Sequence, residues 1–372
     1  MAQITDEHRA ALQLTLIPGV GPRHYRLLVS HFQSAAGVLG SSAKQLRSVP
    51  GMGTKLCQAI CRQQQAGAAQ RIISCCQQHQ VEILIPADAT YPTLLSEIHD
   101  PPGILFCRGL LKPPDALSIA IVGMRRPSQY GLRTACRLAE ELSRAGFTIV
   151  SGLARGIDAA AHRGALSAGG RTLAVLGSGV LNTYPQEHRE LALAIAAQGA
   201  VLSEFPPLSA PPRGAFPQRN RLITGLSLGV IVVEAASRSG ALISARHAME
   251  QGREVLAVPG QIDSHRARGC HLLLKDGAAL VESATDVLQT LGPLAHPATD
   301  RQGRPLFHPR ELQLNAQEQA VLDLIGERAT SIDVIVQQSG LPTARVLATI
   351  SALEMGQLLD RLSGQYVVRH KP

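Results

Sequence analysis

Between residues 118 and 258, six short runs rich in Val, Ile and Leu alternate with longer stretches rich in Ala, Leu and Arg. Continuously apolar strands are buried on both faces of a sheet, and strands joined by helical crossovers run parallel. The sequence therefore predicts an α/β fold with a doubly wound parallel sheet. The predicted strands cover residues 118–122, 148–150, 172–176, 201–203, 230–233 and 255–258, and another strand-like run covers 81–86.

Two Pro-Gly-x-Gly turns near the N-terminus, at 18–21 and 50–53, each lie between helical segments. The first turn of the second helix exposes backbone N–H groups, and helix-hairpin-helix units hold nucleic-acid phosphates in this way. The alternative is a helical domain that uses its glycine turns only for packing. We predict a helical domain of the SAM or helix-hairpin-helix type at 1–79, in which Arg23, Arg26 and Lys55 would carry any binding.

The C-terminal part begins with a Pro-rich stretch without periodicity, which is typical of a linker. We place this linker at 291–312, after an α/β domain at 80–290. Three helical segments follow, and Pro342 suits the first turn of the third. Two short strands flanking a Ser-Gly-Gln turn end the chain. The pattern predicts a winged helix at 313–372, with helices at 316–327, 331–338 and 343–355 and strands at 358–361 and 366–369.

Charge and leader patterns limit the function classes. The chain has 36 Lys and Arg against 28 Asp and Glu, a net charge of +8, which favours polyanionic partners. None of its lysines is followed by Ser or Thr, so a Walker A loop is excluded. The first residues show no signal-peptide pattern, and no apolar run has the length of a membrane span. We expect a cytoplasmic protein.

One cysteine pattern invites comparison with a metal site. Cys57, Cys61, Cys75 and His79 have a spacing that roughly resembles that of zinc ligands. Both pairs, however, lie in segments predicted to be helical, 55–65 and 67–79, where small buried cysteines are common. The chain's 7 cysteines are an odd number, which fits a reducing compartment. We predict no metal.

The loops that leave the carboxyl ends of parallel strands meet at one edge of a sheet. Here those loops are rich in glycine, which admits close backbone approach, and in arginine, whose fork suits phosphate oxygens. Helix N-termini at the same edge add N–H donors. The sequence therefore predicts a phosphate-binding ridge. Its candidate cations are Arg125, Arg155, Arg213, Arg219, Arg221 and Arg238.

One aromatic residue, Phe216, lies between Arg213 and Arg219 in a long predicted loop, 204–221, although the chain has only 5 Tyr and 6 Phe. Rings flanked by cations stack the bases of single strands while phosphates are neutralised. The alternative is a ring that anchors the loop in the core. The segment 177–182 only partly matches a G-x-G-x-x-G fingerprint and follows the third strand, so it is weak support for a dinucleotide cofactor.

Carboxylates also reach this edge, as Asp158, Glu204, Glu234 and Asp263. A pair of them could act as acid and base in nucleotide hydrolysis. More commonly such residues cap helices or orient arginines. We expect no catalytic residue and no cofactor.

Taken in order, several motifs make the chain resemble the DprA (Smf) family over nearly its whole length. They are Tyr91-Pro-x-x-Leu with Asp100-Pro-Pro-x-x-Leu, Ile121-Val-Gly-x-Arg-x-Pro-Ser-x-Tyr-Gly, Ser151-Gly-Leu-Ala-x-Gly-Ile-Asp-x-x-Ala-His, Phe216-Pro-x-Arg-Asn-Arg, Ser239-Gly-Ala-Leu-Ile and Val258-Pro-Gly. The resemblance implies a helical domain, an extended Rossmann domain that forms a homodimer, and a winged helix.

The resemblance also implies a recombination mediator that binds and protects single-stranded DNA during natural transformation and helps to load the RecA recombinase. The family's DNA-contacting arginine matches Arg125, and the basic and aromatic residues of its long loop match Arg213 and Phe216. Met124 stands where Ser or Thr is usual in the family, which puts a hydroxyl contact there in doubt. We predict a DNA-binding set of Gly123, Arg125, Ser151, Gly152, Arg155, Arg213, Phe216, Arg219, Arg221, Ser239 and Gly240.

Other functions are also considered. Residues 311–372 hold 5 basic and 7 acidic side chains, and the recognition helix offers Arg345 against Glu354, so duplex binding by the winged helix is disfavoured. We expect a protein-contact or regulatory role for it. The architecture also resembles nucleoside-monophosphate phosphoribohydrolases of the lysine-decarboxylase-like group. Those enzymes carry Pro-Gly-Gly-x-Gly-Thr followed by Glu, where this chain has Ser239-Gly-Ala-Leu-Ile.

Overall fold

The computed structural model describes residues 4–62, 65–237, 239–292, 316–326, 329–355, 358–362 and 365–369. The chain divides into two compact units, residues 1–284 and 285–372, which we treat separately. Of the described helices, none combines the length and the apolar character that crossing a membrane requires.

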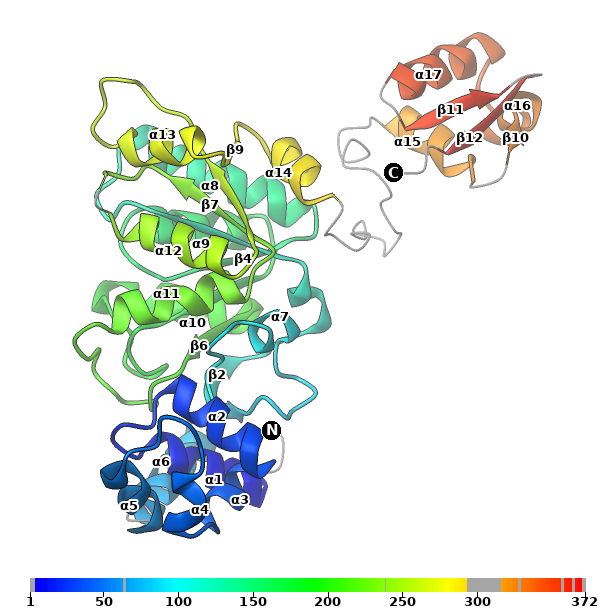
Figure 1. Cartoon of the computed structure of the whole chain (residues 1–372). Coiled ribbons are helices and arrows are strands. Elements are labelled where there is room, and N and C mark those ends of the chain that lie inside the picture. The colour runs from blue at the N-terminus through cyan, green and yellow to red at the C-terminus, as the bar shows by residue number, and fades with distance from the viewer. Residues whose placement is uncertain are drawn as a thin grey trace. The chain divides into compact units, whose positions relative to one another are not determined.

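The first unit is built on one sheet, which in the described part has nine strands in the order β1-β2-β6-β5-β4-β3-β7-β8-β9 (Figure 1). The order reverses between β3 and β7, so a topological switch point lies there. The strands are β1 (Val81–Leu84), β2 (Leu105–Gly109), β3 (Ser118–Gly123), β4 (Thr148–Ser151), β5 (Thr172–Val175), β6 (Ala200–Ser203), β7 (Gly229–Val233), β8 (Glu254–Ala257) and β9 (Ala279–Leu280).

The six strands from β3 to β8 confirm the predicted parallel core, with bounds within about one residue of those read from the apolar runs. One edge differs from the prediction, because β1 and β2 pair antiparallel, and β2 pairs antiparallel with β6. Neither β2 nor the two-residue β9 was predicted. Strand β2 follows a Pro-Pro-Gly segment, which is typical of a turn or loop, so the short apolar run after it was not recognised as a strand.

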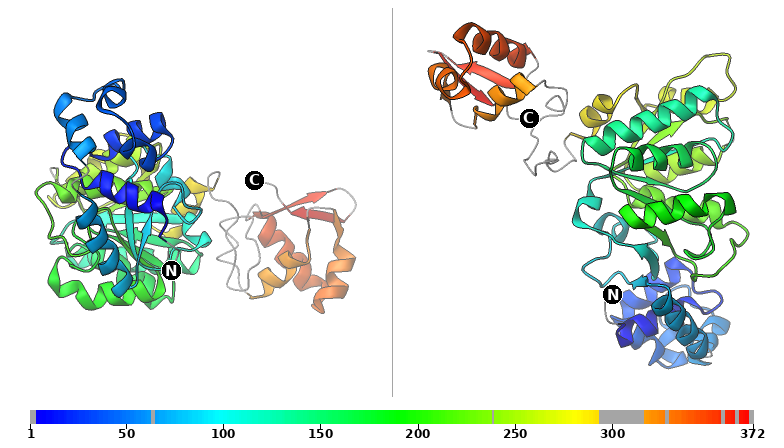
Figure 2. Two further views of the ribbon diagram at one scale, coloured as in Figure 1. Left: turned by 90° about the horizontal axis from the view of Figure 1, so that it is seen from below. Right: turned by 180° about the vertical axis from the view of Figure 1, so that it is seen from behind.

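Helices cover both faces of the sheet. On one face α8 (Gln129–Arg144), α9 (Ile157–Ser167) and α10 (Arg189–Gln198) lie side by side, as the view from behind shows (Figure 2). The other face carries α11 (Ala215–Gly225), α12 (Gly240–Glu250) and α13 (Arg268–Lys275). The short α7 (Thr93–Ser96) packs against α11, and the 3-10 turns Pro113–Ala116 and Gln186–His188 complete the connections.

The N-terminal helices form a small layer against the β1-β2 edge. They are α1 (Asp6–Thr15), α2 (Pro22–Phe32), α3 (Ala35–Leu39), α4 (Ala43–Arg47), α5 (Thr54–Arg62) and α6 (Ala66–Gln78). Gly19 and Gly51 have positive φ angles of 94° and 82°, which explains why each turn before α2 and α5 carries glycine. Leu14 and Ile73 share one buried core with Phe106 of β2 and Ile195 of α10. The helical layer and the sheet therefore pack as one body.

The second unit begins within α14 (Ala284–Leu291), at Thr285, and beyond the undescribed residues 293–315 it contains a winged helix. Its described elements are α15 (Ala316–Asp323), β10 (Thr330–Ser331), α16 (Ile332–Ser339), α17 (Thr343–Met355), β11 (Leu359–Leu362) and β12 (Tyr366–Arg369). The strands form a sheet in the order β10-β12-β11. Val321, Ile335, Val346, Ile350 and Val367 fill its core. The predicted three helices and hairpin are confirmed, although α15 ends earlier than expected.

Candidate nucleic-acid interface

The carboxyl ends of β3 and β7 open onto a cavity of about 270 Å³ at the topological switch point. Loops from both halves of the sheet line it. Six residues of the predicted set are among its lining residues: Gly123, Arg125, Phe216, Arg219, Ser239 and Gly240. A Cβ atom at Gly123 would lie 1.9 Å from the Val233 carbonyl oxygen, so this position requires glycine. The predicted convergence of distant segments at this edge is present in the fold.

Arg125 and Phe216 meet in the centre of this edge. The Arg125 guanidinium carbon lies 5.2 Å from the centroid of the Phe216 ring, a cation–π distance. The ring of Tyr184 lies 5.6 Å from that of Phe216 at an interplanar angle of 43°. Sequence reasoning did not single out Tyr184. Its position in the glycine-rich loop after β5, in a chain so poor in aromatic residues, was the signal available.

Arg213 lies exposed immediately before α11, next to Gly214 with its φ of 79°. It makes no hydrogen bond or ion pair with the described residues, so its charge is available to a ligand. The sequence predicted a loop as far as residue 221, and this was wrong, because the chain is helical from Ala215 onward. Pro217 is tolerated there because the first turn of a helix needs no N–H donor.

The N-terminus of α12 supplies neutral donors to the same cavity. Ser239 is its N-cap residue, but its side chain makes no capping hydrogen bond. The Ser239 hydroxyl is buried and has no partner among the described residues, although it lines the cavity. The start of a helix favours anions, so Ser239 and Gly240 provide a polar wall suited to a phosphate. Arg238, named with the ridge cations, lies outside the described residues.

Arg155 remains at the surface but already has a partner. Its Nε and Nη2 atoms each donate a hydrogen bond of 2.6 Å to the carboxylate of Glu187. This ion pair holds the pKa of Glu187 below its usual range. Both side chains are more than half exposed, so the pair is screened by water. The structure therefore places Arg155 at the edge of the interface with its charge locally balanced.

Arg219 points into the protein, and only 4% of its surface is exposed. Its Nη1 donates to the carbonyl oxygen of Gly152 at 2.6 Å and also to that of Val175. Burial lowers the pKa of Arg219 to about 10, while nearby Asp158 opposes that shift. Burial raises the pKa of Asp158, which accepts hydrogen bonds from Gly152 N–H at 3.2 Å and Ala154 N–H at 3.3 Å.

Arg221 is buried to the same extent and contacts two acidic residues. Its Nη2 donates to Glu204, and its Nε lies 3.3 Å from a carboxylate oxygen of Asp100. Burial raises the pKa of Glu204, and the Arg221 charge opposes the shift. The sequence predicted Arg219 and Arg221 as cations of the phosphate-binding ridge, but in this structure both side chains are buried and bond to groups of the protein. Their guanidinium groups connect α11 to neighbouring loops.

Ser151 and Gly152 are also interior residues. The Ser151 hydroxyl donates to the Ile121 carbonyl oxygen at 2.6 Å, while the backbone N–H and C=O of Gly152 bond to Asp158 and Arg219. A Cβ at Gly152 would lie 2.2 Å from the Arg219 Nη1 atom. These two predicted contact residues therefore support the loop from within, and the structure does not bring them to the cavity surface.

The other two carboxylates at the edge, Glu234 and Asp263, differ in their surroundings. Glu234 accepts a 2.7 Å hydrogen bond from the backbone N–H of Ser128, the N-cap of α8, and another from its hydroxyl. Asp263 lies exposed in the loop after β8. Of the four candidate acids, Asp158, Glu204 and Glu234 thus act in this structure as hydrogen-bond or ion-pair partners of loops and arginines.

The partial G-x-G-x-x-G segment has a packing role. A Cβ at Gly179 would lie 2.1 Å from the Pro206 carbonyl oxygen, and one at Gly177 would lie 3.1 Å from the Phe216 ring. Both glycines allow the loops after β5 and β6 to pack closely. In the sequence, this segment offers only weak support for a dinucleotide site, and a packing role explains its glycines.

The candidate residues of the helical layer differ in their exposure and in their hydrogen bonds. Arg23 and Lys55 are exposed, whereas Arg26 donates hydrogen bonds to the His99 and Ile98 carbonyl oxygens at 2.6 and 3.3 Å. Cys57 is buried in the core and Cys61 is exposed. In the described ranges, no three His, Cys, Asp or Glu side chains are placed to share a metal ion.

Comparison with known proteins shows which family the chain belongs to. The family model described as DNA recombination-mediator protein A matches residues 82–292, more than half of the chain. The chain belongs to the DprA family. A model of the DprA winged helix domain matches residues 306–365, and a SAM-like helix-hairpin-helix tandem matches 11–65. These matches confirm the predicted N-terminal and C-terminal fold types.

Individual DprA relatives extend the match. Protein Smf of Escherichia coli is 42% identical over 287 residues, covering 76% of each chain. The crystal structure of Streptococcus pneumoniae DprA superimposes with a TM-score of 0.68 at 34% identity, covering 77% of this chain and 98% of that one. Helicobacter pylori DNA processing protein A, whose structure was described for its single-stranded DNA binding mode, gives 0.53 at 32% identity, covering 58% and 98%. As a DprA-family protein, the chain is a recombination mediator.

Proposed function

We propose that the chain binds single-stranded DNA along the carboxyl edge of its sheet. Arg125 and Arg213 neutralise phosphates, and Phe216 stacks a base. The observation that carries the proposal is the placement of the Arg125 cation over the Phe216 ring at the rim of the switch-point cavity. An aromatic platform beside exposed cations is the usual chemistry of single-strand recognition. The single-strand binding described for the Helicobacter pylori relative supports the same ligand.

The remaining predicted residues take different parts in this proposal. Ser239 and Gly240 offer a hydroxyl and helix N–H groups to a phosphate. Gly123 lines the cavity and lets the end of β3 pack closely against the Val233 carbonyl oxygen. Arg155 contributes once a phosphate competes with Glu187 for its guanidinium. Arg219, Arg221, Ser151 and Gly152 hold the loops that form the interface, since their polar groups bond inside the protein.

Membership of the family supports a proposal for the cellular role. We propose that the chain protects incoming single strands, helps to load RecA onto them and works as a homodimer through its Rossmann domain. We also propose that it is not an enzyme, since three of the four candidate acids at this edge of the sheet bond to loops and arginines. The division into a helical domain at 1–79, a Rossmann domain at 80–290, a linker at 291–312 and a winged helix at 313–372 stays a prediction.

A competition experiment tests the proposal. Full-length protein is titrated with a fluorescent single strand, and unlabelled single strand, duplex and mononucleotide compete at two salt concentrations. Single strand should compete best, and affinity should fall with salt because counterions are released. Stronger competition by duplex would contradict the proposal. Release of free base from a nucleoside monophosphate by the purified protein would instead favour the phosphoribohydrolase alternative.

A further inference from the structure

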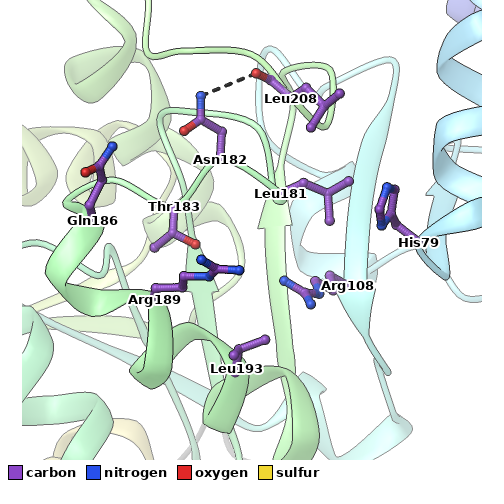
Figure 3. Close-up of a pocket in the computed structure, with 9 residues that line it drawn as sticks. All are labelled: His79, Arg108, Leu181, Asn182, Thr183, Gln186, Arg189, Leu193 and Leu208. Carbon is purple, nitrogen blue, oxygen red and sulfur yellow. Dashed lines mark hydrogen bonds between the residues drawn. The ribbon is translucent and has the colours of Figure 1, made fainter.

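A second and larger cavity, of about 670 Å³, has no part in the interface described above (Figure 3). Its walls come from three regions: the end of α6, where His79 lies, the antiparallel strand β2, and the start of α10 with the loops after β5 and β6. The helical layer and the sheet share one core, and all residues that line the cavity belong to the first unit.

Two arginines face each other across this cavity. Arg108 of β2 and Arg189, the first residue of α10, turn their guanidinium groups toward one another in Figure 3. Neither makes a hydrogen bond or ion pair with any residue in the described part of the chain. The nearby Glu187 carboxylate is bound to Arg155, and no Asp or Glu belongs to the described lining. Two unpaired like charges around one space favour an anion between them.

The rest of the lining suits the other parts of a nucleotide. Asn182, Thr183 and Gln186 offer amide and hydroxyl groups, and the Asn182 amide nitrogen already donates to the Leu208 carbonyl oxygen at 3.3 Å. Leu193 and Leu208 are apolar but 45% and 65% exposed. Such a surface, with polar groups on one side and exposed apolar side chains on the other, can contact a sugar and a base. The positive end of the α10 dipole lies at Arg189.

The cavity also lies next to the proposed strand path. Thr183 and Gln186 belong to the segment that carries Tyr184, whose ring lies 5.6 Å from that of Phe216. We propose that this cavity is a second phosphate-binding site, which takes a nucleotide unit with its phosphate between Arg108 and Arg189. The nucleotide is either part of a bound strand, in which case the inference rests on the proposed function, or a free mononucleotide.

The test uses the full-length double variant Arg108→Gln/Arg189→Gln. Its matched control is Arg133→Gln/Arg163→Gln, which removes two exposed arginines of α8 and α9, and both must unfold at the wild-type temperature. A fluorescent oligothymidylate is titrated over a range of salt. The double variant should lower the salt slope by roughly 0.7 for each phosphate that is no longer neutralised, and the control should not. In a second arm, every protein also carries Arg125→Gln/Arg213→Gln, which removes the interface cations. The line width of the thymidine monophosphate phosphorus signal is then compared with and without Arg108→Gln/Arg189→Gln.

The arms separate the sources of the phosphate. A lower slope in the oligothymidylate arm identifies a strand phosphate, and a loss of line broadening in the monophosphate arm identifies a free nucleotide; either result supports the site. A double variant that matches its control in both arms overturns it. If Arg125→Gln weakens strand binding while the double variant matches its control in both arms, the proposed function stands and the second site fails. The converse result removes the interface assignment and keeps the cavity.

Discussion

The Arg125 guanidinium lies 5.2 Å from the centre of the Phe216 ring, although 91 positions separate the two residues in the sequence. The sheet produces this contact, because Arg125 follows β3 and Phe216 follows β6, and both strands end at the same edge. The pair places a cation and a ring at the mouth of one cavity, which is the arrangement that the proposed binding of a phosphate and a base requires.

Replacing Phe216 separates stacking from anchoring. Phe216→Leu keeps an apolar side chain but removes the ring, and we expect it to weaken single-strand binding by about 1 to 3 kcal/mol for each base stacked. The salt slope should stay at the wild-type value, because every cation remains. Phe216→Tyr is the matched control and should bind like the wild type. Wild-type affinity in Phe216→Leu would show that the ring only anchors the loop.

Replacing the exposed arginines tests the phosphate contacts. Arg125→Gln and Arg213→Gln should each lower the salt slope of single-strand binding by roughly 0.7, the value for one released counterion on a single strand. Arg163→Gln, an exposed position on α9, serves as the control for charge alone. Arg155→Gln should have a smaller effect, because Glu187 already balances that charge. Unchanged slopes in both main variants would remove these arginines from the interface.

Replacing Arg219 should affect stability before binding. Arg219→Gln leaves the carbonyl oxygens of Gly152 and Val175 with fewer donors and removes the cation next to buried Asp158. Breaking a buried charge pair costs about 3 to 5 kcal/mol. Urea unfolding followed by circular dichroism should show a destabilisation of that order, whereas Arg213→Gln should unfold like the wild type. An Arg219→Gln protein of normal stability with weakened binding would point instead to a direct phosphate contact.

The buried histidine of α9 predicts a pH dependence of folding. Burial lowers the pKa of His162 to about 3, and its Nδ1 lies 2.7 Å from the Thr172 hydroxyl. An unfolded histidine takes up a proton near pH 6.5 whereas the folded one does not, so stability falls as pH drops from about 6.5 toward 3.

Since other groups also titrate, the useful quantity is the difference between the wild type and His162→Gln. Urea unfolding between pH 7.5 and 5.5 should show the wild type losing up to about 1.4 kcal/mol more per pH unit below the unfolded pKa. Parallel pH profiles for the two proteins would contradict the assignment of this histidine as neutral in the folded state.

Removing residues 311–372 tests the role of the winged helix. In the described part of the recognition helix α17, the side chain of Arg345 is exposed. The Oε2 atom of Glu354 lies 3.7 Å from the Nε atom of Arg361. We expect most single-strand affinity to survive the deletion, because phosphate attraction dominates DNA binding and this segment has a net negative charge. The same fluorescent titration measures it. Loss of all DNA binding would favour a duplex-binding regulator.

Local sequence patterns predicted many of the strands and turns. The bounds of β3 to β8 could be read from apolar runs because each of those strands is buried on both faces. The glycine turns at Gly19 and Gly51 could be read because few other residues adopt those φ angles. Strand β2 could not, since its stability comes from pairing with β1 and β6, which no local pattern records.

The sequence by itself determined the α/β core, the flanking helical and winged-helix folds, and the gathering of glycine and arginine at one sheet edge. Tertiary structure decided which of those arginines stay exposed and which are buried. Helix α11 starts at Ala215 and rotates each successive residue by about 100°. Arg213 lies before the helix and stays exposed, whereas Arg219 and Arg221 turn inward to carbonyl and carboxylate groups. Burial and available partners, which depend on distant segments, set the role of each charge.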